Sequence, residues 1–305
     1  MIQSKNSLAQ HPFAIWKSPE VTDLLVDFFG ANFIKAELSK DLAKSLIIKV
    51  WENKGTIDAE VLRKEGDVIL NEVSKVAKKP SEEKETLDMV DFNGVKTFLD
   101  IGANKLATIN YYMRKQPEVA RFIGVDIVPK RGQFSNLKKG FYYQVDPEAK
   151  SFPINNESID LVNIQFVFHH FPDLESIKRS LAIYKNIVKP NGRLVLWEES
   201  FTDNFDLSLV KSNNENLGIK TDQELTERFY QLSEEKRWEF IIANDWLINV
   251  NNAHMPWTGQ YYAWREWVEL LREFGFALER EYNLGLRING RLKQGVHMMG
   301  VFRKE

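Results

Sequence analysis

The spacing of apolar residues divides the chain into a helical first part and a mixed second part. Before about residue 80, apolar residues recur every three or four positions, which is typical of amphipathic helices. A first helix is predicted to begin at Ser18-Pro19, with Ser18 as N-cap, and to end at Gly30. A stripe from Leu38 to Val50 predicts a second helix, and residues 58–79 predict a third.

From residue 94 the pattern becomes an alternation of short apolar runs and amphipathic segments. Such alternation predicts βαβ units and a doubly wound, Rossmann-like, mostly parallel sheet. The last two runs are expected to form a terminal hairpin, which would place one antiparallel strand in the sheet. Seven strands are predicted: VKTFLDI, RFIGVDI, GFYYQVD, SIDLVNIQFVF, RLVLWEE, FALEREYN and VHMMGVFR.

Two boundaries follow from these patterns. The charged, proline-containing stretch 77–86 is predicted to be a linker, so residues 1–90 form a helical N-terminal domain that could serve as a lid, a dimerisation surface or an acceptor-side domain. Residues 91–305 form the α/β domain. Residues 201–262 interrupt it as a helical, aromatic-rich insertion, in which Thr221 and Glu224 have the spacing of a capping box.

Composition narrows the classes of function. With 305 residues, 43% hydrophobic and 28% charged, the chain is that of an ordinary globular protein. A net charge of −2 gives no basis for nucleic-acid or membrane binding. The N-terminus lacks a signal-peptide pattern, and the absence of cysteine excludes thiol chemistry. We therefore expect a cytoplasmic location.

Acidic residues are predicted at successive strand ends. Asp100 precedes the turn at Gly102, whose backbone N–H groups suit an anionic group. Asp126 ends the next strand, where a carboxylate can accept hydrogen bonds from both hydroxyls of a ribose. Asp146 ends the third strand, and a proline-containing loop introduces the fourth. This ordered set is more specific than any one member.

These motifs resemble those of the class I S-adenosylmethionine-dependent methyltransferases, in particular the small-molecule branch. "FLDIGAN" is similar to the family's first motif, "FIGVDI" to its second, and "YYQVDPEAKSFPINNESIDLVNI" to its adenine-side loop and fourth strand. The stretch from "FVFHHFPD" to "KPNGRLVLWEE" is similar to the family's helix and fifth strand. The resemblance is close over about residues 94–200 and looser over 264–305.

The resemblance implies S-adenosylmethionine as cofactor and roles for particular residues. Asp100 would hold the cofactor's ammonium, Asp126 its ribose, and Asp146 would lie near the adenine amine. Asn163 and Gln165 would lie close to the sulfonium. The cofactor has no phosphate, so carboxylates can crowd its site without repulsion. The expected cofactor-binding residues are Asp100, Gly102, Ala103, Asn104, Asp126, Ile127, Asp146, Pro147 and Gln165.

The first motif departs from the family at two positions. Asn104 and Leu106 stand where the family usually has glycine. Asn tolerates left-handed backbone, so Asn104 can keep the turn. Leu106 would shift the following helix or impair cofactor binding, because glycine there allows close packing of helix and strand.

His169 and His170 are the candidate catalytic residues. His169 and Asp173 have the spacing seen in some O-methyltransferases of the family, whose histidine is the base, and a neutral imidazole could accept the acceptor's proton. Alternatively the histidines are packing residues and Asp173 is an N-cap. Methyl transfer depends mainly on alignment, so it need not use a base.

Aromatic residues gather between positions 238 and 267, where the family has its acceptor pocket. His254, Trp257, Tyr261 and Tyr262 are the candidate substrate-binding residues, and a local core is the alternative interpretation. The five histidines show no metal-binding spacing, so no metal is expected.

The leading hypothesis is biosynthetic O-, N- or C-methylation of a small organic acceptor by in-line displacement. A degenerate scaffold subunit of the same fold is the alternative, and an NAD(P)-dependent oxidoreductase is a third. The expected partner is a small-molecule acceptor rather than nucleic acid or a membrane, with a possible homodimer through the N-terminal helices.

Overall fold

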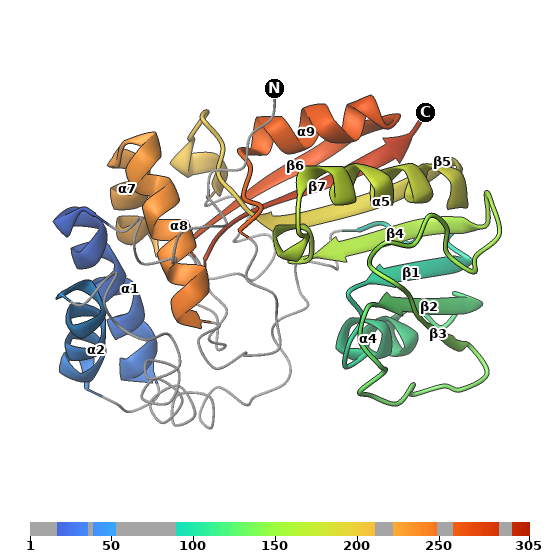
Figure 1. Ribbon diagram of the computed structural model, residues 1–305, viewed down its shortest axis with the longest axis horizontal. Coiled ribbons are helices and arrows are strands. Elements are labelled where there is room, and N and C mark those ends of the chain that lie inside the picture. Colours follow the sequence, from blue (N-terminus) through green and yellow to red (C-terminus); the bar gives the residue numbers. More distant parts are fainter. Residues whose placement is uncertain (1–16, 36–38, 53–89, 211–221, 249–258, 287–294) are drawn as a thin grey trace.

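A seven-stranded sheet forms the centre of the computed structural model (Figure 1). The structure describes residues 17–35, 39–52, 90–210, 222–248, 259–286 and 295–305. The strand order is β3-β2-β1-β4-β5-β7-β6. The strands are β1 (Thr97–Ile101), β2 (Arg121–Asp126), β3 (Gly140–Gln144), β4 (Ile159–Gln165), β5 (Val188–Glu199), β6 (Phe276–Leu286) and β7 (Val296–Lys304).

The predicted fold class is confirmed. Strands β1 to β5 pair in parallel, and β7 lies antiparallel between β5 and β6. The order reverses at β1, which has β2 on one side and β4 on the other. Ligands of doubly wound sheets bind at this switch point, beyond the carboxyl ends of the strands.

Several strand bounds differ from the prediction, and β6 continues to Leu286. β3 ends at Gln144, two residues before Asp146. β4 ends at Gln165 because Phe166 has a φ of 55°, which no extended strand accommodates. β5 begins at Val188 rather than after Gly192, and the Asn191-Gly192 turn lies at a register shift within it.

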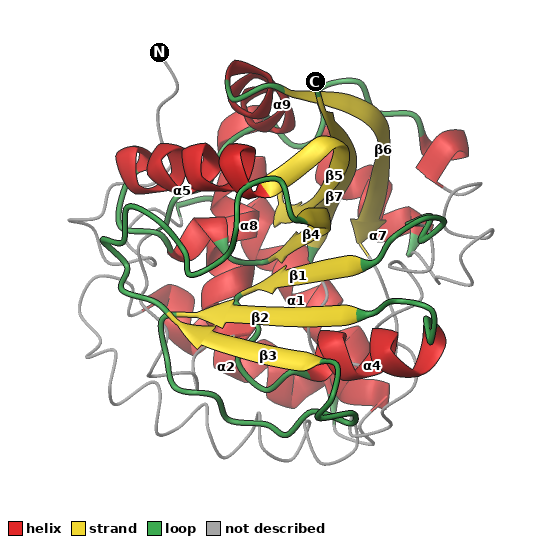
Figure 2. Ribbon diagram, turned by 90° about the vertical axis from the view of Figure 1, so that its right-hand side faces the viewer, coloured by secondary structure: helices red, strands yellow, loops and turns green. Residues whose placement is uncertain are grey.

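Helices cover both faces of the sheet (Figure 2). α4 (Ala107–Lys115) packs on one face through a core that includes Phe98, Ile109 and Trp197. α5 (Leu174–Ile187) and α9 (Trp264–Glu273) pack on the other, through Leu181, Trp267 and further apolar residues. α4 ends before Pro117. Asp173 caps α5 by accepting a 2.7 Å hydrogen bond from the Ser176 N–H, as one of the two interpretations of this residue predicted.

A separate helical layer lies at the end of the sheet where β4 and β5 finish (Figure 1). It contains α1 (Pro19–Lys35), α2 (Lys40–Glu52), α7 (Gln223–Gln231) and α8 (Glu234–Ile248), joined by one hydrophobic core. Glu239 of α8 accepts hydrogen bonds from the Ser18 N–H and hydroxyl, at 3.1 and 2.8 Å. The N-terminal helices therefore pack on the 201–262 insertion.

Several helical predictions need correction. α1 continues through Gly30, where a Cβ would meet the Lys40 side chain at 2.6 Å, so this glycine permits close packing of α1 and α2. Leu42 is 38% exposed rather than inward-facing. Asp222 is the N-cap of α7, accepting from the Leu225 N–H. The predicted helix 58–79, the linker 77–86 and Thr221 lie outside the described residues.

Within the described part of the chain, none of the helices combines the length and apolar character needed to cross a lipid bilayer.

Candidate active site at the strand ends

The turn after β1 has glycine-like backbone at each of three alternate positions. The φ angles are 71° at Gly102, 28° at Asn104 and 59° at Leu106. A Cβ at Gly102 would lie 2.7 Å from a Val167 methyl group, so the turns after β1 and β4 approach each other closely. Asn104 keeps the left-handed turn as predicted, and Leu106 does so as well.

Leu106 is the N-cap of α4, and its side chain is fully buried. It belongs to the core cluster that also contains Phe98, Ile109 and Tyr112. The left-handed backbone at this residue costs on the order of 1 kcal/mol. Burial of its apolar side chain stabilises the fold by more than that, so the net effect on stability is favourable.

Asp126 joins the ends of β1 and β2. Its Oδ2 accepts a hydrogen bond from the Asn104 N–H at 2.8 Å, and its Oδ1 accepts one from the Val128 N–H at 3.2 Å. A carboxylate offers about four acceptor positions, so two more donors can be bound. Asp126 is partly exposed, consistent with such capacity.

Asp100 and Asn163 meet at the switch point between β1 and β4. They are register partners, both are buried, and Asn163 donates from Nδ2 to Asp100 Oδ1 at 2.7 Å. Gln165, two residues further along β4, is partly exposed. The structure thus brings Asp100, Gly102, Asp126 and Gln165 to one edge of the sheet.

The third predicted strand end is more open. Asp146 lies beyond β3, is exposed, and accepts from the Glu148 N–H at 2.7 Å. Pro147 is exposed, and Ile127 is 45% exposed. These residues line the solvent side of the edge.

A buried group of ionisable residues lies next to this edge, at the end of β5. His169 belongs to the short 3₁₀ helix η3 (Phe168–His170), and its Nδ1 lies 2.7 Å from Glu198 Oε2. Glu198 Oε1 accepts from the N–H groups of Val167 and Phe168, at 3.0 and 2.8 Å. The expected neighbour of His169, Asp173, caps α5 instead, so Glu198 is the carboxylate that pairs with the imidazole.

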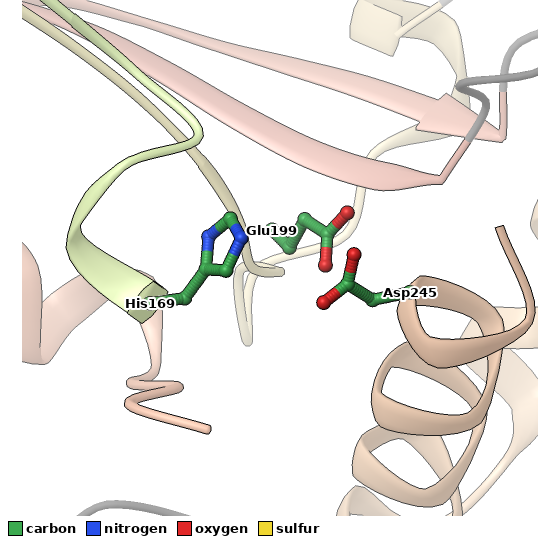
Figure 3. A group of neighbouring side chains, drawn as sticks. All are labelled: His169, Glu199 and Asp245. Carbon is green, nitrogen blue, oxygen red and sulfur yellow. The ribbon is translucent and has the colours of Figure 1, made fainter. Parts of the chain in front are cut away.

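Three side chains from separate elements point toward one another in this group: His169 from η3, Glu199 from β5 and Asp245 from α8 (Figure 3). One nitrogen or oxygen of each lies within 4.8 Å of the others, and all three residues are buried. His297 of β7 adds a second imidazole, with Nε2 3.9 Å from Glu199 Oε1.

The carboxylates change the protonation of this group. Burial alone would lower the pKa of His169. The negative charge and the hydrogen bond of Glu198, together with the charges of Asp245 and Glu199, outweigh this effect and raise the pKa to about 9. At neutral pH the imidazole is therefore a cation. Burial and the same carboxylates raise the pKa of Tyr261 well above its usual range, so its hydroxyl keeps the proton that it donates to Asp245.

Tyr261 and Tyr262, two of the candidate substrate-binding residues, are buried. The Tyr261 ring stacks on His169 with centroids 5.7 Å apart and planes at 6°. Tyr262 packs on Trp267 and donates to Gln260 at 2.7 Å. The Gln260 N–H donates to the His169 carbonyl, so this segment lies beside η3. His254 and Trp257 lie outside the described residues.

The donor set at the strand ends fits a phosphate-free adenosyl cofactor. Asp100, Asp126 and Asp146 put carboxylates at three neighbouring ends, where a pyrophosphate would be repelled. Gly102 is exposed and carries no side chain, and Leu106 packs in the core. Asp126 keeps acceptor capacity for ribose hydroxyls.

Comparison with known families agrees with this geometry. Residues 99–196, which run from β1 into β5, match the family model described as "Methyltransferase domain". This part of the chain is therefore similar to a methyltransferase domain. The matched residues are fewer than half of the chain, and they include the left-handed turn, Asp126 and both histidines of η3. No protein with a curated description matches the sequence.

Solved structures with the methyltransferase fold are similar at low sequence identity. The pyocyanin biosynthetic protein PhzM is 17% identical with a TM-score of 0.48, covering 95% of this chain and 74% of its own. The mitomycin 7-O-methyltransferase MmcR is 14% identical with a TM-score of 0.48, covering 84% and 63%. A putative methyltransferase solved in complex with a Haloferax volcanii methyltransferase activator is 13% identical with a TM-score of 0.47, covering 81% and 97%. These values carry no information on substrate.

Sequence reasoning missed three residues of the buried ionisable group: Glu198, Glu199 and Asp245. The two glutamates end a predicted strand in "LVLWEE", which was a usable signal because carboxylates were also predicted at the ends of the first three strands. Asp245 gave no signal, since its place beside His169 depends on how α8 packs.

The left-handed turn predicts an unusual order of stabilities at Leu106. Leu106→Ala should lower the free energy of unfolding by about 2–4 kcal/mol through the lost packing. Leu106→Gly should be more stable than Leu106→Ala by about 1 kcal/mol, because glycine adopts a positive φ without strain. Urea denaturation of both variants measures the difference.

Ile109 in the same helix is the matched control. It is fully buried and helical, so Ile109→Gly should be less stable than Ile109→Ala by about 1 kcal/mol. If the glycine variant were less stable than the alanine variant at both positions, Leu106 would not have a left-handed backbone in solution.

The raised pKa of His169 predicts a pH dependence of stability. The imidazole titrates near 6.5 when unfolded and about 9 when folded, so its stabilising effect is complete below about pH 6.5 and is lost as the pH rises through 9. The loss is on the order of 3 kcal/mol. Urea denaturation between pH 6 and pH 10, in a buffer with EDTA so that no ion competes for the imidazole, measures the free energy of unfolding. The native sequence should show this loss of stability, and His169→Gln should show much less of it. An imidazole resonance of His169 titrating at or below 6.5 would contradict this assignment.

Proposed function

We propose that the protein transfers a methyl group from S-adenosylmethionine to a small organic acceptor. The observation that carries the proposal is the left-handed Gly102–Leu106 turn, fixed to Asp126 at the switch point of the sheet. It lies within the residues that match the methyltransferase family. The acidic strand ends support this cofactor over NAD(P), whose pyrophosphate they would repel.

In this proposal each strand end holds one part of the cofactor. Asp100, Gly102, Ala103 and Asn104 lie beside its amino-acid part, and Asp126 accepts from its ribose hydroxyls. Ile127, Asp146 and Pro147 border the adenine. Gln165 lies beside the sulfonium, which supplies an activated methyl group when the cofactor is bound.

The chain's own contribution to the chemistry is alignment of the acceptor at the ends of β4 and β5. Bound S-adenosylmethionine would supply the methyl group: an acceptor lone pair would form the new bond to carbon, and sulfur would keep the electron pair of the broken carbon–sulfur bond. His169 is poorly suited to receive the acceptor's proton, because it is buried and its raised pKa keeps it protonated at neutral pH. We propose that His169 positions its neighbours, and that the half-buried His170 is the better candidate for a base.

The remaining parts of the proposal concern partners. The net charge of −2 favours a small molecule over nucleic acid as acceptor. The helical layer of α1, α2, α7 and α8 lies toward the ends of β4 and β5, which supports a role as a cover on the acceptor side. A homodimer through α1 and α2 stays a prediction.

Calorimetry tests the cofactor directly. S-adenosylmethionine and S-adenosylhomocysteine should bind with one site per chain, and NAD should give no signal. Binding of NAD alone would favour the oxidoreductase, and absence of binding by all three would favour the scaffold.

Asp126→Asn should weaken S-adenosylhomocysteine binding by about 2 kcal/mol, or about thirtyfold, through the lost charge-assisted hydrogen bonds. The amide keeps the shape of the side chain and one acceptor oxygen. Asp173→Asn is the control, because Asp173 is an exposed cap of α5 away from the turn. Equal affinity of the two variants would remove Asp126 from the cofactor site.

A further inference from the structure

A buried asparagine at the switch point of the sheet lacks a donor for its side-chain oxygen. Asn163 of β4 is 1% exposed, and its Nδ2 donates to Asp100 Oδ1 at 2.7 Å. Its Oδ1 is buried as well, and none of the described residues donates a hydrogen bond to it. A buried amide oxygen without a donor costs free energy, so folded proteins rarely contain one. A bound group that donates to Asn163 Oδ1 would remove this cost.

The orientation of the Asn163 amide is fixed by its neighbour. Asp100 is the register partner of Asn163 on β1 and is itself buried. An ionised carboxylate only accepts hydrogen bonds, so the amide nitrogen faces Asp100 and the amide oxygen faces away from it. Rotating the amide by 180° would place its oxygen against the carboxylate, which repels it. The acceptor on Asn163 is therefore a fixed feature of this strand end.

A second oxygen of this kind lies in the turn after β1. Asn104 donates its backbone N–H to Asp126, but its side-chain Oδ1 is buried and receives no hydrogen bond from the described residues. Asn104 follows β1, and Asn163 belongs to the strand that pairs with β1. Doubly wound sheets bind their ligands where two such strands meet. The switch point therefore offers acceptors, and it fits a ligand that supplies a donor.

The chemistry of S-adenosylmethionine limits which donor this is, a step that rests on the proposed function. The strand order β3-β2-β1-β4 places Asp146, Asp126 and Asp100 one after another along the edge. The adenine amine and the ribose hydroxyls then belong to the ends of β3 and β2. The donor left for the ends of β1 and β4 is the α-ammonium group. The negative charge of Asp100, next to Asn163, favours a cationic donor over a neutral one.

We propose that Asn163 Oδ1 accepts a hydrogen bond from the α-ammonium group of the cofactor, and that this bond makes the site select adenosyl thioethers that carry the amine. This role differs from the place beside the sulfonium that the family resemblance implied for Asn163. Gln165, at the end of the same strand, keeps that place.

Calorimetry of the full chain tests the proposal with two ligands that differ in one group. They are S-adenosylhomocysteine and its deamino analogue, in which hydrogen replaces the α-amino group. The native chain should bind S-adenosylhomocysteine about thirtyfold more tightly than the analogue. Asn163→Leu keeps the approximate size of the side chain without its polar atoms. It should bind S-adenosylhomocysteine about tenfold more weakly than the native chain, with the affinity for the analogue unchanged.

Asn283→Leu is the matched control. Asn283 is also a buried asparagine of the sheet, but it lies in β6 at the opposite edge from β3. Its side chain is bonded at both ends, to the Tyr230 hydroxyl and the Gly285 N–H. This variant should keep the native preference for the amine, and circular dichroism checks that each variant is folded.

A crystal structure of the native chain with S-adenosylhomocysteine tests the contact without any variant. The amine nitrogen should lie within about 3.2 Å of Asn163 Oδ1. Equal affinity of the native chain for the two ligands, the full native preference in Asn163→Leu, or an amine bonded elsewhere would overturn the role of Asn163 alone. Absence of binding by both ligands would overturn it together with the proposed function, so the two failures are distinguishable.

Discussion

The hydrogen bond from the Asn104 backbone N–H to Asp126 is the contact on which the proposed cofactor site depends. It fixes the turn after β1 to the end of β2 with a carboxylate as acceptor, a type of bond stronger than one between neutral groups. The turn reaches this contact only with positive φ angles at Gly102, Asn104 and Leu106. Burial of the Leu106 side chain offsets the backbone strain at that position.

A second constraint acts at the neighbouring strand end. Glu198 and Glu199 finish β5 inside the protein, where Asp245 of α8 adds another carboxylate. These charges raise the pKa of His169 and fix its ring between two acidic neighbours. The same packing that buries the carboxylates brings the insertion and the sheet together, since Tyr261 both stacks on His169 and donates to Asp245.

The fold could be predicted from the sequence because its signals are local. Apolar runs predicted all seven strands, and the terminal hairpin predicted the antiparallel β7. Ends of elements were harder: α1 passes through Gly30 because tertiary packing against α2 outweighs the local preference of glycine. Asp100, Gly102 and Asp126 could be found because parallel strands put consecutive turns at one edge. The partner of His169 could not, because Glu198 lies 29 residues away and is brought near only by strand pairing.

The most direct test of the account is a crystal structure of the chain with S-adenosylhomocysteine. The account predicts the amino-acid part of the ligand over Gly102 and both ribose hydroxyls within about 3 Å of the Asp126 oxygens. The ligand should not contact α1 or α2. A ligand bound away from the ends of β1 and β2, or a turn that blocks it through the Leu106 side chain, would contradict the central claim.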